Sequence, residues 1–469
     1  MSSTLTRFLP LLIAAVLGGA VLYARKRVPA ALVTLMITAF IDMVGLLIVL
    51  PLLPFYAMSL AGDGVVVPLG GGRTFSIGVG LVVALLVTAF TVAQLVSAPL
   101  WGRFSDRWGR RPALLIALGA SAVAYVIFGF ATSLTVLFLS RLVQGAGGGT
   151  VGVIQAYVAD ATEPEHRARN LGWLSAATNL GVFLGPVLGS LSVSLGAGPG
   201  LAVFGGRVAL GHAAPGLIAA LLCLVNMAFA WRFLRESNVG LSAATTAERA
   251  VADRARRPGA SRAALWRVVR HSSEPAPRLI WIYAIAIGAQ QGITTVLALF
   301  LAERYGVTEK TIGFFFMYIG GWAVLSRALL LGKALDRFGE ARLSRIGSSL
   351  LALGLAAIPF TYSLPALAAA VTLIPLGTAF TFPCVTAMLS RVIPPYERGL
   401  YMGVQQTFGG ISRGVFPIVL GLAWDHANPG LARGVPFWLS ASLVAGTIFL
   451  GLGMEGYVKP KKAEPVAAD

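Results

Sequence analysis

The sequence predicts an all-α polytopic membrane protein, with two pseudo-symmetric six-helix bundles and one extra helix at the N-terminus. Composition is the first observation: 57% of the 469 residues are hydrophobic and only 12% are charged, against about 25% charged in a soluble protein. The second is that the apolar residues form blocks of roughly twenty, the length of a helix that crosses a bilayer. The third is that a charged turn of the first half recurs in the second.

Thirteen apolar runs follow one another along the chain, without the ten-residue alternation of a membrane β-barrel. They are approximately residues 8–24, 31–57, 76–100, 113–131, 134–159, 170–194, 213–233, 279–303, 310–331, 343–362, 365–390, 399–423 and 435–454. We therefore expect an extra transmembrane helix in 1–28, a first bundle in 29–233, a connector in 234–278, a second bundle in 279–456 and a tail in 457–469.

The second half of the chain repeats landmarks of the first. Residues 102–109 (Gly-Arg-Phe-Ser-Asp-Arg-Trp-Gly) return 230 positions later as 332–339, while 167–172 return as 398–403, and Pro186 as Pro417, 231 positions later. Three matches at nearly one offset indicate a duplication. Parallel repeats are related by an axis along the membrane normal, which places a binding site between the halves near the midplane.

Positive charge gives the orientation. If the 99–112 loop is cytoplasmic and the runs alternate, 28 of the 37 Lys and Arg residues fall on that side and 6 on the other. Because cytoplasmic loops collect Lys and Arg, the net charge of +18 does not indicate a nucleic-acid partner. We expect a multi-pass protein of the plasma (inner) membrane, with the connector and C-terminus in the cytoplasm and the N-terminus outside.

The first run, residues 8–24, has two interpretations. Its length of about seventeen residues also suits a signal peptide, but cleavage would leave Arg25–Arg27 outside, against the charge asymmetry. An uncleaved helix is therefore favoured, and such a helix could dock a protein partner.

The 99–112 loop is highly charged although it lies between two apolar runs. Charged side chains are too costly in hydrocarbon, so this stretch is predicted to be a tight turn at the membrane surface. Gly102 and Gly109 allow the backbone to turn sharply. The charged residues of the loop are Arg103, Asp106, Arg107, Arg110 and Arg111.

Five motifs in order give a resemblance to a known family. They are the 99–112 loop, its degenerate copy 332–340, Arg141–Gly145 (Arg-Leu-Val-Gln-Gly), Gly181–Gly189 (Gly-Val-Phe-Leu-Gly-Pro-Val-Leu-Gly), and Asp42–Gly45 with Pro51 and Pro54. From about residue 31 onward the chain resembles the major facilitator superfamily, in particular its drug:proton antiporter branch with the tetracycline-efflux-type proteins. The extra N-terminal run departs from the family's usual twelve helices, and Glu340 stands where the first half has Arg110.

Asp42 and Arg141 are the candidates for proton coupling. Each lies deep in an apolar run, where a charged side chain costs roughly 2.5–3.5 kcal/mol, so we expect them to face each other. The resemblance supports this, because the helix-4 arginine of drug:proton antiporters looks toward helix 1. Protonation of Asp42 would uncouple the pair. The alternative is a fixed ion pair that only holds the bundle together.

The charged turns are candidates for gating. The resemblance implies that Asp106 meets the positive N-terminus of a helix beginning near Gly399, and Arg107 or Arg110 can reach Asp160. We expect these contacts to form a latch that assembles when the cytoplasmic side closes; the alternative is that the charges only set topology. The gating candidates are Gly102, Asp106, Arg107, Gly109, Arg110, Asp160, Asp336 and Arg337.

Small and polar residues within the runs have structural and binding interpretations. Gly181, Gly185 and Gly189 permit close helix packing, and Pro186 favours a bend. Candidate substrate contacts are Gln144, Asn179, Gln290 and Gln291; Gln94, Gln155, Gln405 and Gln406 are further polar residues, each able to line a cavity or bond a neighbouring helix. Aromatic candidates, each of which fits lipid or core contact better, are Phe40, Phe55, Tyr56, Phe314, Phe315 and Tyr318.

Cofactor and metal sites are not predicted. Cys223 and Cys384 lie in apolar runs, and the four histidines are scattered without ligand spacing. The glycines at 145 and 147–149 lack the preceding strand and the Lys-Ser/Thr of a nucleotide loop. Arginines between 254 and 270 alternate with apolar residues in the connector, which predicts a short amphipathic helix on the anionic inner leaflet.

These features leave three functional hypotheses, none of which is an enzyme. The first is a proton-coupled exporter of small hydrophobic compounds, cationic or zwitterionic ones included, that works by alternating access. The second is a transporter of the same fold for a lipid, a sugar or a metabolite. The third is a membrane assembly or scaffold subunit that transports nothing. A cavity blocked by large side chains would favour the third.

Overall fold

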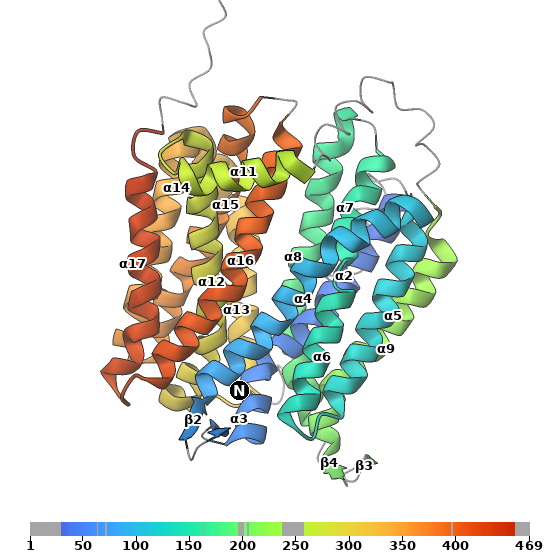
Figure 1. Ribbon diagram of the computed structural model, residues 1–469, viewed down its shortest axis with the longest axis vertical. Coiled ribbons are helices and arrows are strands. Elements are labelled where there is room, and N and C mark those ends of the chain that lie inside the picture. The colour runs from blue at the N-terminus through green and yellow to red at the C-terminus, as the bar shows by residue number, and fades with distance from the viewer. Residues whose placement is uncertain are drawn as a thin grey trace, which may run out of the picture.

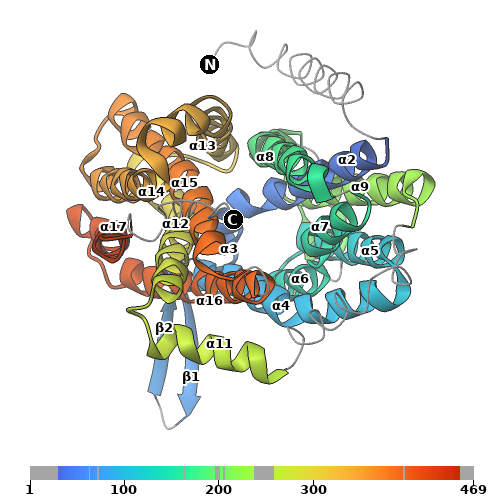
Figure 2. The same ribbon diagram turned by 90° about the horizontal axis from the view of Figure 1, so that it is seen from above.

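The computed structural model describes residues 30–454, except residues 63, 71–72, 163, 196–200, 204–205, 237–257 and 395–396. The described chain is almost entirely helical and forms two bundles that stand side by side (Figures 1 and 2). The expected N-terminal helix at residues 8–24, the tail at 457–469 and much of the connector lie outside the described residues.

The first bundle contains the helices that precede the connector. Its first span is bent at η1, where Pro51 and Pro54 remove backbone donors. A second break follows α6, because Gly148 and Gly149 separate it from α7. The elements are α2 (Ala30–Val49), η1 (Leu50–Leu52), α3 (Leu53–Ala61), α4 (Val79–Trp108), α5 (Arg110–Gly129), α6 (Leu134–Gly147), α7 (Thr150–Asp160), α8 (Pro164–Ser194) and α9 (Leu210–Phe233).

The second bundle begins after a short helix of the connector, α11 (Pro258–Arg270). Its helices are α12 (Pro275–Tyr305), α13 (Ile312–Leu325), η3 (Ser326–Leu330), α14 (Leu331–Ala357), η4 (Ile358–Phe360), α15 (Leu364–Val392), α16 (Arg398–Asp425), η5 (Leu431–Gly434) and α17 (Val435–Leu450).

Eleven helical segments of the described chain are long and apolar enough to cross a membrane. One of them, residues 312–360, has 49 residues and would be about 74 Å long if straight, more than twice the hydrocarbon thickness. Gly339 breaks it with a φ of 69° and a ψ of 167°, so it contributes two spans. The twelve apolar runs predicted between residues 31 and 454 therefore all correspond to helices, which confirms the all-α membrane fold.

Two short antiparallel hairpins were not predicted from the sequence. The first pairs β1 (Gly64–Gly70) with β2 (Arg73–Gly78), and the second pairs β3 (Leu201–Val203) with β4 (Gly206–Val208). Both lie at the lower end of Figure 1. We call this end the hairpin end, and the opposite end, which holds the 102–111 and 332–345 turns, the basic end.

The two bundles touch near the hairpin end and diverge toward the basic end (Figure 1). The contacts run between α4 and α16 and between α8 and α13. Near the hairpin end, a Cβ built on Gly313 of α13 would collide with the carbonyl oxygen of Pro186 on α8. At the basic end, a Cβ built on Gly102, Gly399 or Gly403 meets no atom within 4 Å. The interface is therefore closed at one end only.

The connector helix α11 lies across the basic end, roughly perpendicular to the other helices (Figure 1). Ala264 and Val268 are buried against the second bundle, while Trp266 and Val269 are exposed beside the arginines. The predicted amphipathic helix is present.

Candidate functional site

A cavity of about 1010 Å³ lies between the two bundles. Its walls come from α2, α4, α6 and α7 of the first bundle and from α12 and α16 of the second. It extends from Leu50 and Leu53, beside the bend of the first span, to Asp106 and Arg110 at the basic end. A solute entering from the basic end can thus reach the middle of the bundle.

The lining combines an apolar wall with amides and arginines. Phe90, Trp101, Met43, Leu46 and Leu86 supply apolar surface. Four glutamines of the wall, from both bundles, can donate and accept hydrogen bonds; they are Gln94, Gln155, Gln291 and Gln406. Three lining residues are cationic, namely Arg110, Arg141 and Arg413, and the described lining contains one acid, Asp106.

The substrate contacts expected from the sequence divide accordingly. Gln291 lines the cavity. Gln144 is buried, Asn179 donates to the carbonyl oxygen of Ser175 at 2.6 Å within its own helix, and neither they nor Gln290 belong to the described lining. The aromatic candidates are also absent from the described lining, whose aromatic side chains are Phe90 and Trp101. The pattern of the apolar runs in the sequence does not show which polar side chains face the cavity and which contact a neighbouring helix.

Asp42 lies on α2 just behind the cavity wall. Its side chain is buried, and the carboxylate accepts a hydrogen bond of 2.8 Å from the hydroxyl of Thr150, at the start of α7. Its neighbour Met43 and the adjoining Gly149 line the cavity. One packing shell therefore separates the carboxylate from the space that a solute would fill.

Arg141 on α6 is 2% exposed and does line the cavity. The guanidinium carbon lies 5.1 Å from the centroid of the Phe128 ring, and Nη2 has no hydrogen-bond partner. The expected ion pair is not formed in this structure: among the ion pairs of the described residues, none joins Arg141 to Asp42, whose carboxylate is held by Thr150 instead.

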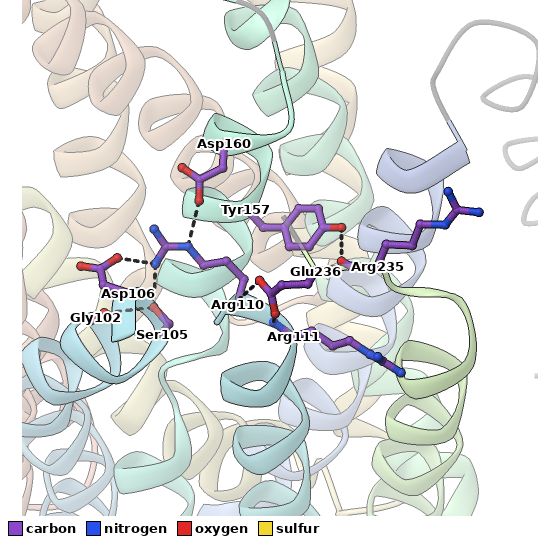
Figure 3. Close-up of polar contacts among 9 residues, drawn as sticks. All are labelled: Gly102, Ser105, Asp106, Arg110, Arg111, Tyr157, Asp160, Arg235 and Glu236. Carbon is purple, nitrogen blue, oxygen red and sulfur yellow. Dashed lines mark hydrogen bonds and ion pairs between the residues drawn. The ribbon is translucent and has the colours of Figure 1, made fainter. Parts of the chain in front are cut away.

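The turn between α4 and α5 is organised around Arg110 (Figure 3). Its guanidinium forms ion pairs with Asp106 at 2.7 Å and with Asp160, the last residue of α7, at 2.9 Å, and it donates to the hydroxyl of Ser105 at 2.7 Å. Of the two arginines considered from the sequence, Arg110 is thus the one that reaches Asp160; Arg107 is exposed. Because both pairs exist while the basic end is open, the expectation that closure assembles the Asp160 contact was wrong.

Glu236 completes this turn and was missed by sequence reasoning. Its carboxylate accepts hydrogen bonds from the backbone N–H groups of Arg110 at 2.8 Å and Arg111 at 3.1 Å, so it caps the N-terminus of α5. Gly109 has a φ of 105°, and a Cβ there would collide with the Glu236 carboxylate. A single acid soon after the seventh apolar run, residues 213–233, was the available signal.

The second copy of the turn, at residues 332–340, forms different ion pairs from the first. Asp336 and Arg337 are exposed. Glu340, in the position that corresponds to Arg110, is buried and pairs with Arg391 of α15 at 2.7 Å. The ion pairs of the two turns therefore differ, as expected from Glu340 standing in the position of Arg110.

The glycines of α8 pack directly on α2. A Cβ on Gly181 would lie 2.8 Å from the Cβ of Met43, one on Gly185 would lie 2.6 Å from the Cβ of Leu47, and one on Gly189 would collide with the carbonyl oxygen of Ile48. This is the close helix approach expected of small residues in membrane helices. It fixes α2, and with it Asp42, against α8.

Comparison with known proteins places these features in one family. The chain matches the Major Facilitator Superfamily over residues 35–417 and 292–466. It is 28% identical over 406 residues to "Tetracycline resistance protein, class C" of Escherichia coli, covering 84% of this chain and 92% of that protein. It is 26% identical over 451 residues to "Multidrug resistance protein 2" of Bacillus subtilis, covering 93% and 96%.

Solved structures agree on the fold. The "human organic anion transporter MFSD10 (TETRAN)" superposes with a TM-score of 0.61 at 23% identity, covering 90% of this chain and all of that one. A "D-xylose-proton symporter" superposes with a TM-score of 0.68 at 13% identity, covering 91% and 97%. At these identities the likeness concerns the fold alone.

Proposed function

Since the chain belongs to the Major Facilitator Superfamily of membrane transporters, we propose that it exports small hydrophobic compounds in exchange for protons by alternating access. The observation that carries the proposal is the cavity of about 1010 Å³, whose lining reaches Gly102 and Asp106 at the basic end, while the bundles pack closely at the hairpin end, as at Gly313 and Pro186. Rocking of one bundle against the other would open the cavity to the opposite side.

The orientation of the protein in the membrane follows from the asymmetric distribution of Lys and Arg. Cytoplasmic loops collect Lys and Arg, so the basic end faces the cytoplasm. The conformation described here is then the one that loads substrate from the cytoplasm. The resistance proteins to which the chain is similar favour export over uptake.

Asp42 and Arg141 are the proposed proton-coupling residues. Asp42 is a buried carboxylate on a helix that lines the cavity, and the partner it has here, Thr150, is a neutral hydroxyl. Arg141 keeps one guanidinium nitrogen unpaired. A deprotonated Asp42 would attract this cation, and a proton on Asp42 would release it, so protonation can bias the positions of α2 and α6.

The test uses full-length protein in liposomes loaded with the pH-sensitive dye pyranine. Addition of tetracycline, or of another drug from a resistance screen, should cause proton movement in the parent protein and none with Asp42→Asn. Glu303→Gln is the matched control, since Glu303 forms only an exposed ion pair with Arg433. Substrate accumulation against a gradient by Asp42→Asn would rule out Asp42 as the coupling site. Drug movement without proton movement in the parent would rule out exchange.

The scaffold hypothesis is less well supported, because its distinguishing feature would be a blocked cavity. The described cavity is large enough for a drug-sized molecule. A same-fold transporter of a lipid, sugar or metabolite remains the alternative; tight, saturable binding of a sugar, with no drug effect on proton movement, would favour it.

A further inference from the structure

We propose that the substrates of this transporter are organic anions, and that Arg413 holds the anionic group opposite the cationic Arg141 of the other bundle. The inference rests on the proposed function in taking the central cavity as the transport site. It departs from the cationic compounds considered from the sequence, because the charge of the cavity wall has the wrong sign for them.

The charged side chains of the cavity wall are mostly cations. Among the described residues that line the cavity, Arg110, Arg141 and Arg413 are cations and Asp106 is the sole acid. Arg110 and Asp106 form an ion pair at the mouth, and Arg110 binds Asp160 as well. Neither Arg141 nor Arg413 has an ion-pair partner among the described residues. The deeper part of the cavity is therefore cationic.

Arg141 carries a buried positive charge that is not fully compensated. A guanidinium that is 2% exposed normally has all its N–H groups bonded, yet Nη2 of Arg141 has no partner. An uncompensated buried charge is costly. A carboxylate or sulfonate held by Arg413 in the cavity would lie opposite this cation and balance its charge, while the covered nitrogen Nη2 stays available to Asp42.

Arg413 reaches the cavity from the second bundle. Gln406, Gly410 and Arg413 of α16 all line the cavity, and their spacing of four and three residues puts them on one helix face. Arg413 thus points to the same space as Arg141 but belongs to the other bundle. A bound anion would link the two bundles, which couples occupancy of the site to their relative movement.

The uncharged residues of the cavity wall determine which substrate structure can surround the anionic group. Phe90, Trp101, Leu50 and Leu86 offer aromatic and aliphatic surface, and Gln94 and Gln291 offer neutral hydrogen bonds. A carboxylate attached to an aromatic or otherwise apolar body matches this combination. A small inorganic anion would leave the apolar wall uncovered.

The test uses three probes of one shape: 1-naphthylacetate, its neutral amide 1-naphthylacetamide, and the cation 2-(1-naphthyl)ethylammonium. Equilibrium binding of tritiated 1-naphthylacetate is measured on the full chain in lipid nanodiscs, with each unlabelled probe as competitor. The anion should compete at least tenfold better than the amide, and the ammonium should not compete. Equal competition by all three, stronger competition by the ammonium, or no saturable anion binding would overturn the proposal.

Variants of Arg413 test whether this residue binds the anion. Arg413→Gln should weaken binding of the anion about ten- to hundredfold, the usual effect of losing a hydrogen bond to a charged group. Arg413→Lys should restore part of the affinity, because it keeps the charge without the planar fork. Arg398→Gln removes the same charge from an exposed site on the same helix and should bind as the parent does. Anion affinity that is unchanged in Arg413→Gln would refute the assignment.

The two proposals can fail separately. Anion binding that depends on Arg413, without proton movement in liposomes, would contradict proton exchange and leave the substrate class intact. Proton-linked movement of the amide or the ammonium, but not of the anion, would keep the proposed function and overturn the anion site.

Discussion

Glu340 and Arg391 form a buried-to-surface ion pair of 2.7 Å that mirrors the pair of Arg110 and Asp160, with the charges exchanged. The positions correspond within the internal repeat, at offsets of 230 and 231. In the first bundle the cation comes from the turn and the acid from the end of α7. In the second bundle the turn supplies the acid and α15 the cation. Both halves of the repeat therefore keep an ion pair between the turn and the end of a later helix, but the acid and the cation have changed places.

The exchange predicts an asymmetric response to neutralisation. The side chain of Glu340 is 8% exposed and that of Arg391 is 57% exposed. Arg391→Gln leaves a buried carboxylate without its cation and should lower the free energy of unfolding by about 1–3 kcal/mol. Glu340→Gln leaves a solvated arginine and should cost less.

Thermal unfolding of the purified variants in one detergent measures this difference. The double variant Glu340→Gln/Arg391→Gln should be more stable than Arg391→Gln alone, since it buries no unpaired charge. Equal losses in the two single variants would mean that burial of Glu340 is unimportant.

The fold was largely predictable because the bilayer imposes run length and charge asymmetry on the sequence. A contact of Asp160 with Arg107 or Arg110 was also predictable, since these residues lie at helix ends on the same side of the membrane, but the choice between the two arginines was not. The ion pair of Asp42 with Arg141 was not correctly predicted. Both residues lie at a similar depth in the membrane, but depth does not tell which face of a helix a side chain occupies.

Two further features of the site, the position of Arg413 and the helix cap by Glu236, are visible only in the three-dimensional structure. Arg413 carried no sequence signal beyond its place in an apolar run, and only the cavity wall shows that it meets the same space as Arg141. Glu236 caps a helix that begins 126 residues earlier. Contacts of this kind depend on tertiary packing, which spacing along the chain does not encode.

A cross-bundle helix cap is predicted to hold the hairpin end closed. The carboxylate of Asp425, at the end of α16, accepts hydrogen bonds of 2.8 Å from the backbone N–H groups of Gly80 and Leu81 in the first turn of α4. A Cβ on Gly80 would lie 2.7 Å from this carboxylate, so the glycine makes the approach possible. Loss of a helix cap costs about 0.5–2 kcal/mol, so Asp425→Ala should raise the population open at this end about two- to thirtyfold.

Cysteine accessibility from the outside measures the shift. In a background with Cys223 and Cys384 replaced by Ser, Leu53→Cys reports on the cavity, because Leu53 lines it and is fully buried here. An impermeant maleimide should label it faster with Asp425→Ala than with Glu303→Gln, an acid removed elsewhere at the same end. Equal rates would show that the cap does not control closure.

Glu309, in the loop between α12 and α13, gives a pH-dependent prediction. Burial raises the pKa of this half-buried carboxyl, and the smaller attraction of Lys310 lowers it. The folded protein then binds this proton more tightly than the unfolded chain, so stability falls as pH rises from below the ordinary pKa through the raised one. Glu309→Gln should therefore raise the unfolding temperature at pH 7 and change it little at pH 4. Lys310→Gln should have the opposite effect at pH 7, and a gain for Glu309→Gln at pH 4 alone would contradict the argument.

The last prediction concerns Asp106 as the part of the basic-end network that responds to closure. Arg110 already binds Asp106 and Asp160 while the basic end is open, so those pairs do not distinguish the two states. Closure would bring the N-terminus of α16 to the Asp106 carboxylate, a contact worth about 0.3–1 kcal/mol.

Asp106→Asn should therefore favour the open basic end about two- to fivefold, and a cysteine at Gln406, on the cavity wall of α16, should be labelled faster from the cytoplasmic side. Asp160→Asn is the control: it also loses an ion pair with Arg110, but Asp160 ends α7 and is not the carboxylate that the N-terminus of α16 would meet, so this variant should lower stability without faster labelling. Unchanged labelling in Asp106→Asn with normal insertion would leave the charged turn with only its role in topology. Faster labelling in both variants would mean that the Arg110 network, and not the contact with α16, sets the balance between the two states.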